Sequence, residues 1–328
     1  MQKTLLPFST AVNDCVQTVT RAAIELGSGC IRLQVADVDA GAQKITKVHL
    51  IHYMHVDFAK DLKIGEKGAF SQEIMARAIS AVKELKNMAL AFSPDCFCAV
   101  ATEAFRCSKN GQELVQQIAQ EAGVNVEIAT HEQEALYGFF NAMSLSGIEH
   151  NSLISWDSGA GSFQLAAYHE GGLEMFLGRF GRIPVQHYII ETLQKRDYSK
   201  THSPNPITEK EAMQTVSYIK SQLQSCPQAL ISKIHTQDSP VICVGAHPRA
   251  VDLGICYSQE DIKALLFASL DKSDDEFSSD EPQFIVSDLI LAYSVMTALG
   301  IKKAVRYSSK FAGNTSGLLI NSDLWPLA

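Results

Sequence analysis

Two stretches of the sequence, IELGSGCIRL at residues 24–33 and WDSGAGSFQL at residues 156–165, decide how the chain is expected to fold. When they are superimposed, acidic residues align with each other and so do the glycines: Glu25 with Asp157, Gly27 with Gly159, Gly29 with Gly161, Cys30 with Ser162, and Leu33 with Leu165. Each stretch is typical of a strand, an acidic residue, an x-Gly-x-Gly turn and a second strand. The repeat favours two related αβ domains that face each other. The alternative is chance similarity between two glycine-containing hairpins.

The segments around both stretches alternate strands and helices. Strands are expected at residues 22–27, 30–39, 47–58, 96–102, 124–130, 152–159, 162–169, 173–180, 240–246 and 304–307. Helices are expected at about residues 71–85, 110–122, 131–143, 184–194, 208–224, 258–270 and 286–299. Ser71, Thr208 and Ser258 have the side chains that favour the first position of a helix, and Gly123 should end one. The acidic run at residues 271–281 is expected to be a solvated loop.

The alternation indicates an α/β fold with two domains, which suits a chain of 328 residues. We place the first domain at residues 1–130 and the second at residues 131–309. We expect the segment of about 310–328 to pack back on the first domain.

Composition limits the classes of function. Hydrophobic residues make up 46% and charged residues 20%, as in ordinary globular proteins. The net charge of −8 disfavours nucleic-acid and membrane-surface binding, because both partners attract basic faces. The eight cysteines form no C-x-x-C pair, and residues 1–20 lack the apolar run of a signal peptide. We therefore expect a cytoplasmic protein that binds neither nucleic acid nor membrane.

The repeated loop suggests its own chemistry. A tight glycine turn directs successive backbone N–H groups into one space and lets a phosphate approach closely. The acidic residue before the turn would repel a bare phosphate, but it becomes useful when a divalent cation lies between the two. Two such loops across a cleft could hold a phosphate chain from both sides. A purely structural hairpin remains the alternative for each loop.

Two further segments, ATEAFRCSKNG at residues 101–111 and IATHEQEALYG at residues 128–138, lie between the loops. In this order and spacing, the four motifs resemble the exopolyphosphatase/guanosine pentaphosphate phosphohydrolase (Ppx/GppA) family. The resemblance covers roughly residues 20–320. It implies two ribonuclease-H-like domains, of the actin and sugar-kinase type, that face across a phosphate-binding cleft. The chain is expected to be this two-domain core alone.

The resemblance also implies roles for individual residues. Glu134 matches the catalytic base that activates water, and only one of residues 132–134 can point squarely into the cleft. The positions that match phosphate-binding ones are Arg106, Gly27, Ser28, Gly29, Cys30, Arg32, Gly159, Ala160, Gly161 and Ser162. Glu25 and Asp157 match positions linked to Mg²⁺. Alternatives stay open: Arg106 as a structural ion-pair partner, and Glu134 as a solvent-facing side chain.

The chain departs from the family pattern at several positions. Glu25 stands where Asp is usual, and Gly29-Cys30 where Asn-Ser is usual. In the second loop Ala160, Phe163 and Gln164 replace glycine, threonine and glutamate. A later G-G-T loop has become residues 245–248, where Pro248 lacks a backbone donor, and an R-E-G signature has become residues 315–317.

The expected function is release of terminal phosphate from polyphosphate or a phosphorylated guanosine nucleotide, with Mg²⁺. Because of the departures, a regulatory protein that binds the same ligands with weakened catalysis is the alternative. Phosphoryl transfer to an acceptor is a third reading. A homodimer is an open alternative for the oligomeric state.

Overall fold

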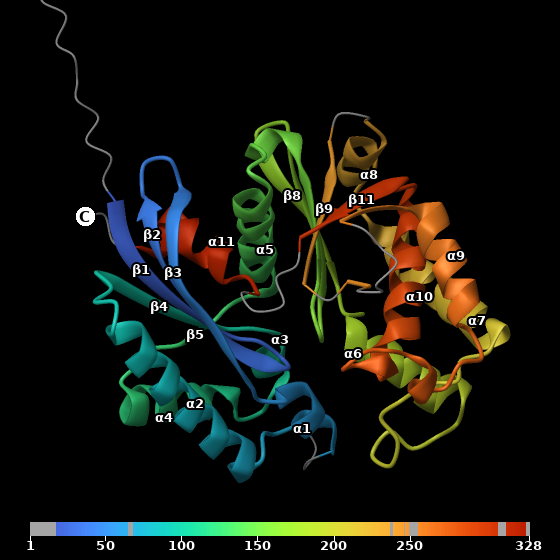
Figure 1. Ribbon diagram of the computed structural model, residues 1–328, viewed down its shortest axis with the longest axis horizontal. Coiled ribbons are helices and arrows are strands. Elements are labelled where there is room, and N and C mark those ends of the chain that lie inside the picture. Colours follow the sequence, from blue (N-terminus) through green and yellow to red (C-terminus); the bar gives the residue numbers. More distant parts are fainter. Residues whose placement is uncertain are drawn as a thin grey trace, which may run out of the picture.

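The structure is a computed structural model that describes residues 18–64, 68–236, 239–245, 247–248, 255–307 and 313–325. The expectations for residues 1–17, for Ala246 and for residues 308–312 and 326–328 therefore fall outside the described residues. Two β-sheets, each with its own helices, lie on either side of a central helix (Figure 1).

The first sheet has the strand order β3-β2-β1-β4-β5. Its strands are β1 (Thr18–Leu26), β2 (Cys30–Asp39), β3 (Lys44–His55), β4 (Cys96–Ala101) and β5 (Glu127–Ile128). β1, β2 and β3 form an antiparallel meander, whereas β4 and β5 run parallel to β1. The helices of this half are α1 (Phe58–Ile64), α2 (Gln72–Leu90), α3 (Glu103–Cys107) and α4 (Gly111–Ala122).

The second sheet repeats this order and adds one strand at its edge. Its strands are β6 (Ile154–Ser158), β7 (Phe163–His169), β8 (Gly172–Gly178), β9 (Val241–Gly245), β10 (Cys256–Ser258) and β11 (Lys303–Arg306). From one edge the order is β8-β7-β6-β9-β11-β10, with β6–β8 antiparallel and with β9 and β11 parallel to β6. The two sheets therefore share the ribonuclease-H-like topology, and the sequence repeat reflects a structural repeat.

Helices pack on the second sheet along its outer side (Figure 1). They are α6 (Arg182–His187), a π-helix (Tyr188–Leu193), α7 (Glu209–Gln222), α8 (Gln228–His235), α9 (Gln259–Ser269) and α10 (Pro282–Leu299). Among the described helices, α10 alone has the length and hydropathy of a membrane span, but 61% of that window is buried inside the protein. A helix that is apolar on most sides and packed in this way is typical of a protein core.

Local signals explain why several helices begin and end where they do. The hydroxyl of Ser71 accepts from the backbone N–H of Ile74 at the start of α2, and Thr208 and Ser258 form full capping boxes. Gly123, in the left-handed region with φ of 61°, ends α4 as expected.

The central helix α5 (His131–Ser146) serves both sheets. Its Tyr137 packs in a cluster with residues of the first sheet and with Leu318 of α11 (Thr315–Ile320), while Phe139 and Ala142 pack against the second sheet. A side chain at Gly317 would collide with the carbonyl oxygen of Tyr137, so α11 and α5 approach closely only because glycine stands there.

The structure corrects some details of the sequence reading. α1, α3, α8, α11 and β10 were not expected, and β5 is only two residues long. The segment expected as one helix at 184–194 is divided into α6 and the π-helix. The acidic run is not wholly a solvated loop, because residues 274–276 form a 3₁₀ helix and Glu281 pairs with Arg182.

Candidate active site

The two glycine loops close with the same hydrogen bond. The backbone N–H of Gly27 donates to the carbonyl oxygen of Cys30 at 3.0 Å, and that of Gly159 donates to the carbonyl oxygen of Ser162 at 2.8 Å. Each loop joins the first two strands of its sheet. The two loops therefore have equivalent places in the two halves of the molecule.

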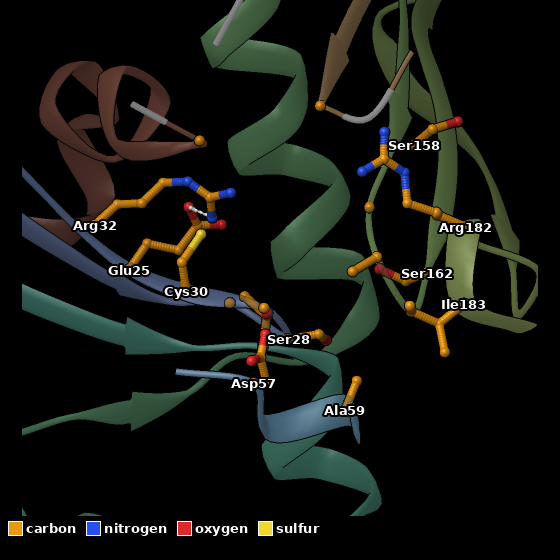
Figure 2. A pocket seen from close by; sticks show the side chains of 18 of the residues that line it. Glu25, Ser28, Cys30, Arg32, Asp57, Ala59, Ser158, Ser162, Arg182 and Ile183 are labelled. Atoms are coloured by element: carbon orange, nitrogen blue, oxygen red, sulfur yellow. Dashed lines mark hydrogen bonds and ion pairs between the residues drawn. The ribbon is translucent and has the colours of Figure 1, made fainter. Parts of the chain in front are cut away.

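Both loops line one cavity of about 530 Å³. Figure 2 shows residues of the first loop on one side of it and residues of the second loop on the other. Of the residues implied by the resemblance, the lining contains Glu25, Gly27, Ser28, Gly29, Cys30, Arg32, Glu134, Asp157, Gly159, Ala160, Gly161 and Ser162. Arg106 and Gln164 are not part of this lining.

Glu25 and Asp157, the acidic residues before the two turns, are linked by one asparagine. The backbone N–H of Asn314 donates to Glu25 Oε2 at 3.0 Å, and its side-chain Nδ2 donates to Asp157 Oδ2 at 2.9 Å. Space for the carboxylate of Asp157 depends on two glycines. A Cβ on Gly138 would lie 2.9 Å from Oδ2, and one on Gly245, which has φ of 84°, would lie 2.5 Å from Oδ1.

The two buried carboxyls hold their protons more tightly than usual. Burial raises the pKa of Asp157 from 3.8 to about 7; the neighbouring Glu134 and Glu25 add to the rise, and the Asn314 hydrogen bond opposes it. Burial also raises the pKa of Glu25, although Arg32 partly compensates. Burial is therefore the main reason that both carboxyls favour the protonated form.

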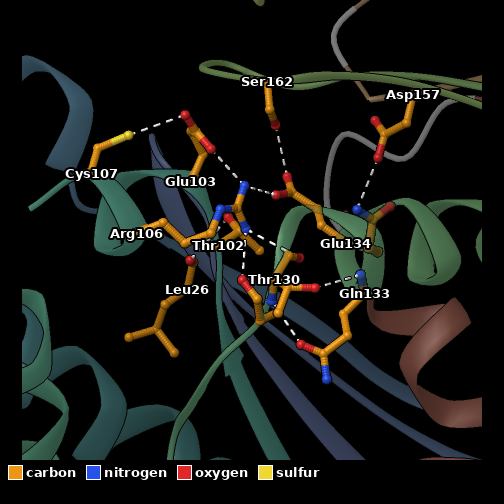
Figure 3. A network of polar contacts seen from close by, with 12 residues as sticks. Leu26, Thr102, Glu103, Arg106, Cys107, Thr130, Gln133, Glu134, Asp157 and Ser162 are labelled. Carbon is orange, nitrogen blue, oxygen red and sulfur yellow. Dashed lines mark hydrogen bonds and ion pairs between the residues drawn. The ribbon is translucent and has the colours of Figure 1, made fainter. Parts of the chain in front are cut away.

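Glu134 is positioned by the first turn of α5. Thr130 and Gln133 form the capping box that fixes the helix start, and this register buries Glu134 while Glu132 stays exposed. Ser162 Oγ donates to Glu134 Oε1 at 2.8 Å, and Arg106 pairs with Oε2 (Figure 3). The carboxylate thus reaches the cavity, and its contact with Ser162 ties α5 to the second loop.

Arg106, on α3, contacts several protein groups through both of its terminal nitrogens. Its Nη2 contacts Glu103 Oε2 at 2.6 Å and also pairs with Glu134, and its Nη1 donates to the carbonyl oxygen of Ala129 at 2.8 Å (Figure 3). Arg106 therefore forms ion pairs within the protein, and its role in binding phosphate stays a prediction.

Gln164 lies on β7 directly opposite Asp157 on β6. The side chain is 2% exposed, and within the described residues neither its Nε2 nor its Oε1 has a hydrogen-bond partner. Buried amide groups without partners are rare.

Other lining residues were missed by sequence reasoning. Arg182 lies at the start of α6, where its guanidinium pairs with Asp288 and Glu281 and its backbone N–H donates to the carbonyl oxygen of Gly159. Asn314 also was not singled out. Neither residue belongs to a motif with a recognisable spacing, so no sequence signal marked them.

The donor set suits a hard divalent cation. In the described part of the chain no three His, Cys, Asp or Glu side chains form a ready-made metal site. Mg²⁺, however, is usually held by one or two carboxylates together with water and phosphate oxygens. Glu25 and Asp157 provide such carboxylates, because both line the cavity beside the glycine loops and both are contacted by the same residue, Asn314. The residues present therefore fit the ion.

His247, in the segment expected as a third loop, does not reach the cavity lining. It is 2% exposed and contacts the carbonyl oxygen of Trp156 through Nε2 at 3.2 Å. Burial lowers its pKa to about 3, so the ring is neutral at physiological pH.

Comparison with solved structures identifies the same architecture. A PPX-GPPA enzyme of Aquifex aeolicus has 21% identity and a TM-score of 0.71, with 93% of this chain and 99% of that chain covered. An exopolyphosphatase from Cytophaga hutchinsonii has 16% identity and a TM-score of 0.68, with 92% and 96% covered. An exopolyphosphatase-like protein has 19% identity and a TM-score of 0.73, with 92% and 97% covered. At these identities the likeness establishes the fold.

A family likeness is found in the sequence itself. Residues 35–177 match the Ppx/GppA phosphatase family, and this region includes the motifs of Arg106, Glu134 and the second glycine loop. The chain, with its two ribonuclease-H-like halves, is therefore similar to the Ppx/GppA phosphatase family over residues 35–177, and it shares the fold of the solved structures.

Proposed function

We propose that the protein is a Mg²⁺-dependent phosphoanhydride hydrolase that releases terminal phosphate from polyphosphate or a phosphorylated guanosine nucleotide. The observation that carries the proposal is the contact between Glu134 and Ser162. It brings a buried carboxylate against the second of two facing glycine loops, where a terminal phosphoryl group would meet its attacking water.

The chain's own residues would act mainly by positioning. Backbone N–H groups of the two loops would hold phosphate oxygens, and Arg32 would add positive charge on the first-domain side of the cavity. Glu25 and Asp157 would hold Mg²⁺, which supplies charge neutralisation for the phosphate chain. Glu134 would accept the proton of the attacking water at one of its carboxylate oxygens.

Substitution of the proposed base tests this function. Glu134→Gln should lower turnover by roughly 10²–10⁴, the usual contribution of a positioned acid–base group. Binding of the phosphate chain should survive, because the amide is isosteric and still accepts from Ser162. Glu132→Gln is the matched control, since Glu132 lies two residues away on the same helix and is exposed. Unchanged turnover in Glu134→Gln would refute the assignment of the base.

A second function has specific support. Gln164 stands where the family usually has glutamate, and Arg106 is neutralised by Glu103 and Glu134. Both features favour a regulatory protein that binds phosphate compounds but hydrolyses them poorly. Phosphate release from polyphosphate with Mg²⁺, compared with equilibrium binding of the same compound, separates the two. Binding without release would favour the regulator.

A further inference from the structure

Hydrogen-bond acceptors of the protein already occupy most of the N–H groups with which Arg106 could bind a phosphate. The guanidinium contacts two carboxylates, Glu103 and Glu134, and the carbonyl oxygens of Ala129 and Thr130. One positive charge is thus shared between two negative charges before any phosphate arrives. These contacts use four of the five N–H groups, so a bidentate contact with one phosphoryl group requires the release of at least one of the four acceptors.

Three of these acceptors are poorly suited to leave. The two carbonyl oxygens belong to the backbone that enters α5. Glu134 is 5% exposed, and Ser162 also holds it through a hydrogen bond of 2.8 Å. Displacing Glu134 would also remove the proposed base from its place at the second loop.

Glu103 differs from the other three. It is the first residue of the five-residue helix α3, and its side chain is 16% exposed. Its Oε1 already has a second partner, the thiol of Cys107, at 3.1 Å, so the carboxylate has a neighbour to turn towards when it releases the arginine. The side chain also lies against the second loop, because a Cβ on Gly161 would be only 3.1 Å from Glu103 Cγ.

We propose that Glu103 is a positioning residue that holds Arg106 out of the cavity until a phosphate group competes for the guanidinium. This inference rests on the proposed function, because it assumes that phosphate compounds enter the cavity. A multiply charged phosphate terminus can displace a single carboxylate, since hydrogen bonds between arginine and phosphate are charge-assisted and bidentate. Whether a ligand can bind Arg106 therefore depends on its negative charge, because it must replace Glu103 at the guanidinium.

The test is a double-mutant cycle on tripolyphosphate binding, measured by calorimetry with Mg²⁺ present. Glu103→Gln keeps the size of the side chain but removes the competing charge, so it should tighten binding by about tenfold, the scale of one charge-assisted hydrogen bond. In the Arg106→Ala background the same substitution should not change the affinity for tripolyphosphate, because the expected gain in affinity depends on the guanidinium of Arg106. Glu84→Gln, at an exposed position of α2, is the control for a general loss of negative charge.

Kinetics add a readout that a merely structural role would not move. Glu103→Gln should lower KM for tripolyphosphate with kcat unchanged, because Glu103 takes no part in the chemical step. The inference is refuted if Glu103→Gln binds no more tightly than wild type, or if the tightening persists in Arg106→Ala.

The outcomes also separate this inference from the proposed function. Wild type that binds and hydrolyses tripolyphosphate, with no change in Glu103→Gln, would overturn the role of Glu103 alone. Absence of binding and hydrolysis in both proteins would overturn both proposals. Binding by Glu103→Gln but not by wild type would support the inference strongly.

Discussion

The pH dependence of stability should report directly on Asp157. The pKa of this carboxyl rises from 3.8 to about 7 in the folded protein, chiefly because the group is buried. At roughly 1.4 kcal/mol per pKa unit, the shift amounts to about 4 kcal/mol in favour of the protonated form. Between these pH values the folded protein binds a proton that the unfolded chain has released. The free energy of unfolding should therefore fall as pH rises from about 4 to about 7.

Asp157→Asn removes this titration and keeps a side-chain oxygen that accepts from Asn314. The variant should lose less stability than wild type as the pH is raised, and at pH 8 it should be the more stable protein by up to about 4 kcal/mol. Urea denaturation from pH 5 to pH 8, with a chelator present, measures the difference. Asp323→Asn, at an exposed position, serves as the control.

Two results would contradict the reasoning. Parallel curves for wild type and Asp157→Asn would mean that Asp157 is already ionised in the folded protein at low pH.

A second test of Asp157 uses the metal. Mg²⁺ added at pH 8 should restore stability to wild type and restore less to the variant, because the ion prefers the ionised carboxylate. Equal recovery in both proteins would mean that Asp157 does not hold the ion.

Four further substitutions follow from the contacts of the site. Arg106→Ala leaves two partly buried carboxylates without their cation, so it should cost about 3–5 kcal/mol of unfolding free energy by denaturation and weaken tripolyphosphate binding about tenfold or more. Gly245→Ala should destabilise the protein by more than about 1 kcal/mol, because φ is 84° and the new Cβ would press on Asp157; a small loss would contradict the geometry. Asn314→Ala removes the hydrogen bond that opposes the raised pKa of Asp157, so the pH midpoint of the stability curve should move upward. Gln164→Glu should shift the magnesium dependence of phosphate release to lower concentrations, and an unchanged dependence would argue against a role in metal binding.

Features that depend on neighbouring residues were predicted well from the sequence. The hydrogen bond that closes each glycine loop spans only four residues, so the turn can be predicted from the glycines of the loop and their neighbours. The register of α5 likewise follows from the capping box of Thr130 and Gln133, which decides that Glu134 rather than Glu132 is buried. Local hydrogen bonding explains both features, although the choice of Glu134 among residues 132–134 was implied by the family resemblance and not by the helical period.

Contacts between distant segments could not be predicted in this way. Asn314 links Glu25 with Asp157 from a segment that lies far from both in the chain, and nothing in its neighbours marks it. Glu281 belongs to an acidic run whose composition favours solvent, yet it pairs with Arg182 across the fold. Such pairings depend on how helices pack, which local patterns do not encode.

Gln164 shows how the departures from the family pattern can be understood physically. A buried amide with no partner is costly, but a glutamate at this position would place another carboxylate directly opposite Asp157. Asp157 already shares its surroundings with Glu25 and Glu134, and both raise its pKa. Without a cation, a further negative charge would add to the same repulsion, whereas the amide adds none. With a cation bound, that charge would be favourable, so the glutamine should stabilise the metal-free protein at the expense of metal affinity. The departure at residue 164 should therefore affect how tightly Mg²⁺ is held more than how the phosphate chain is bound.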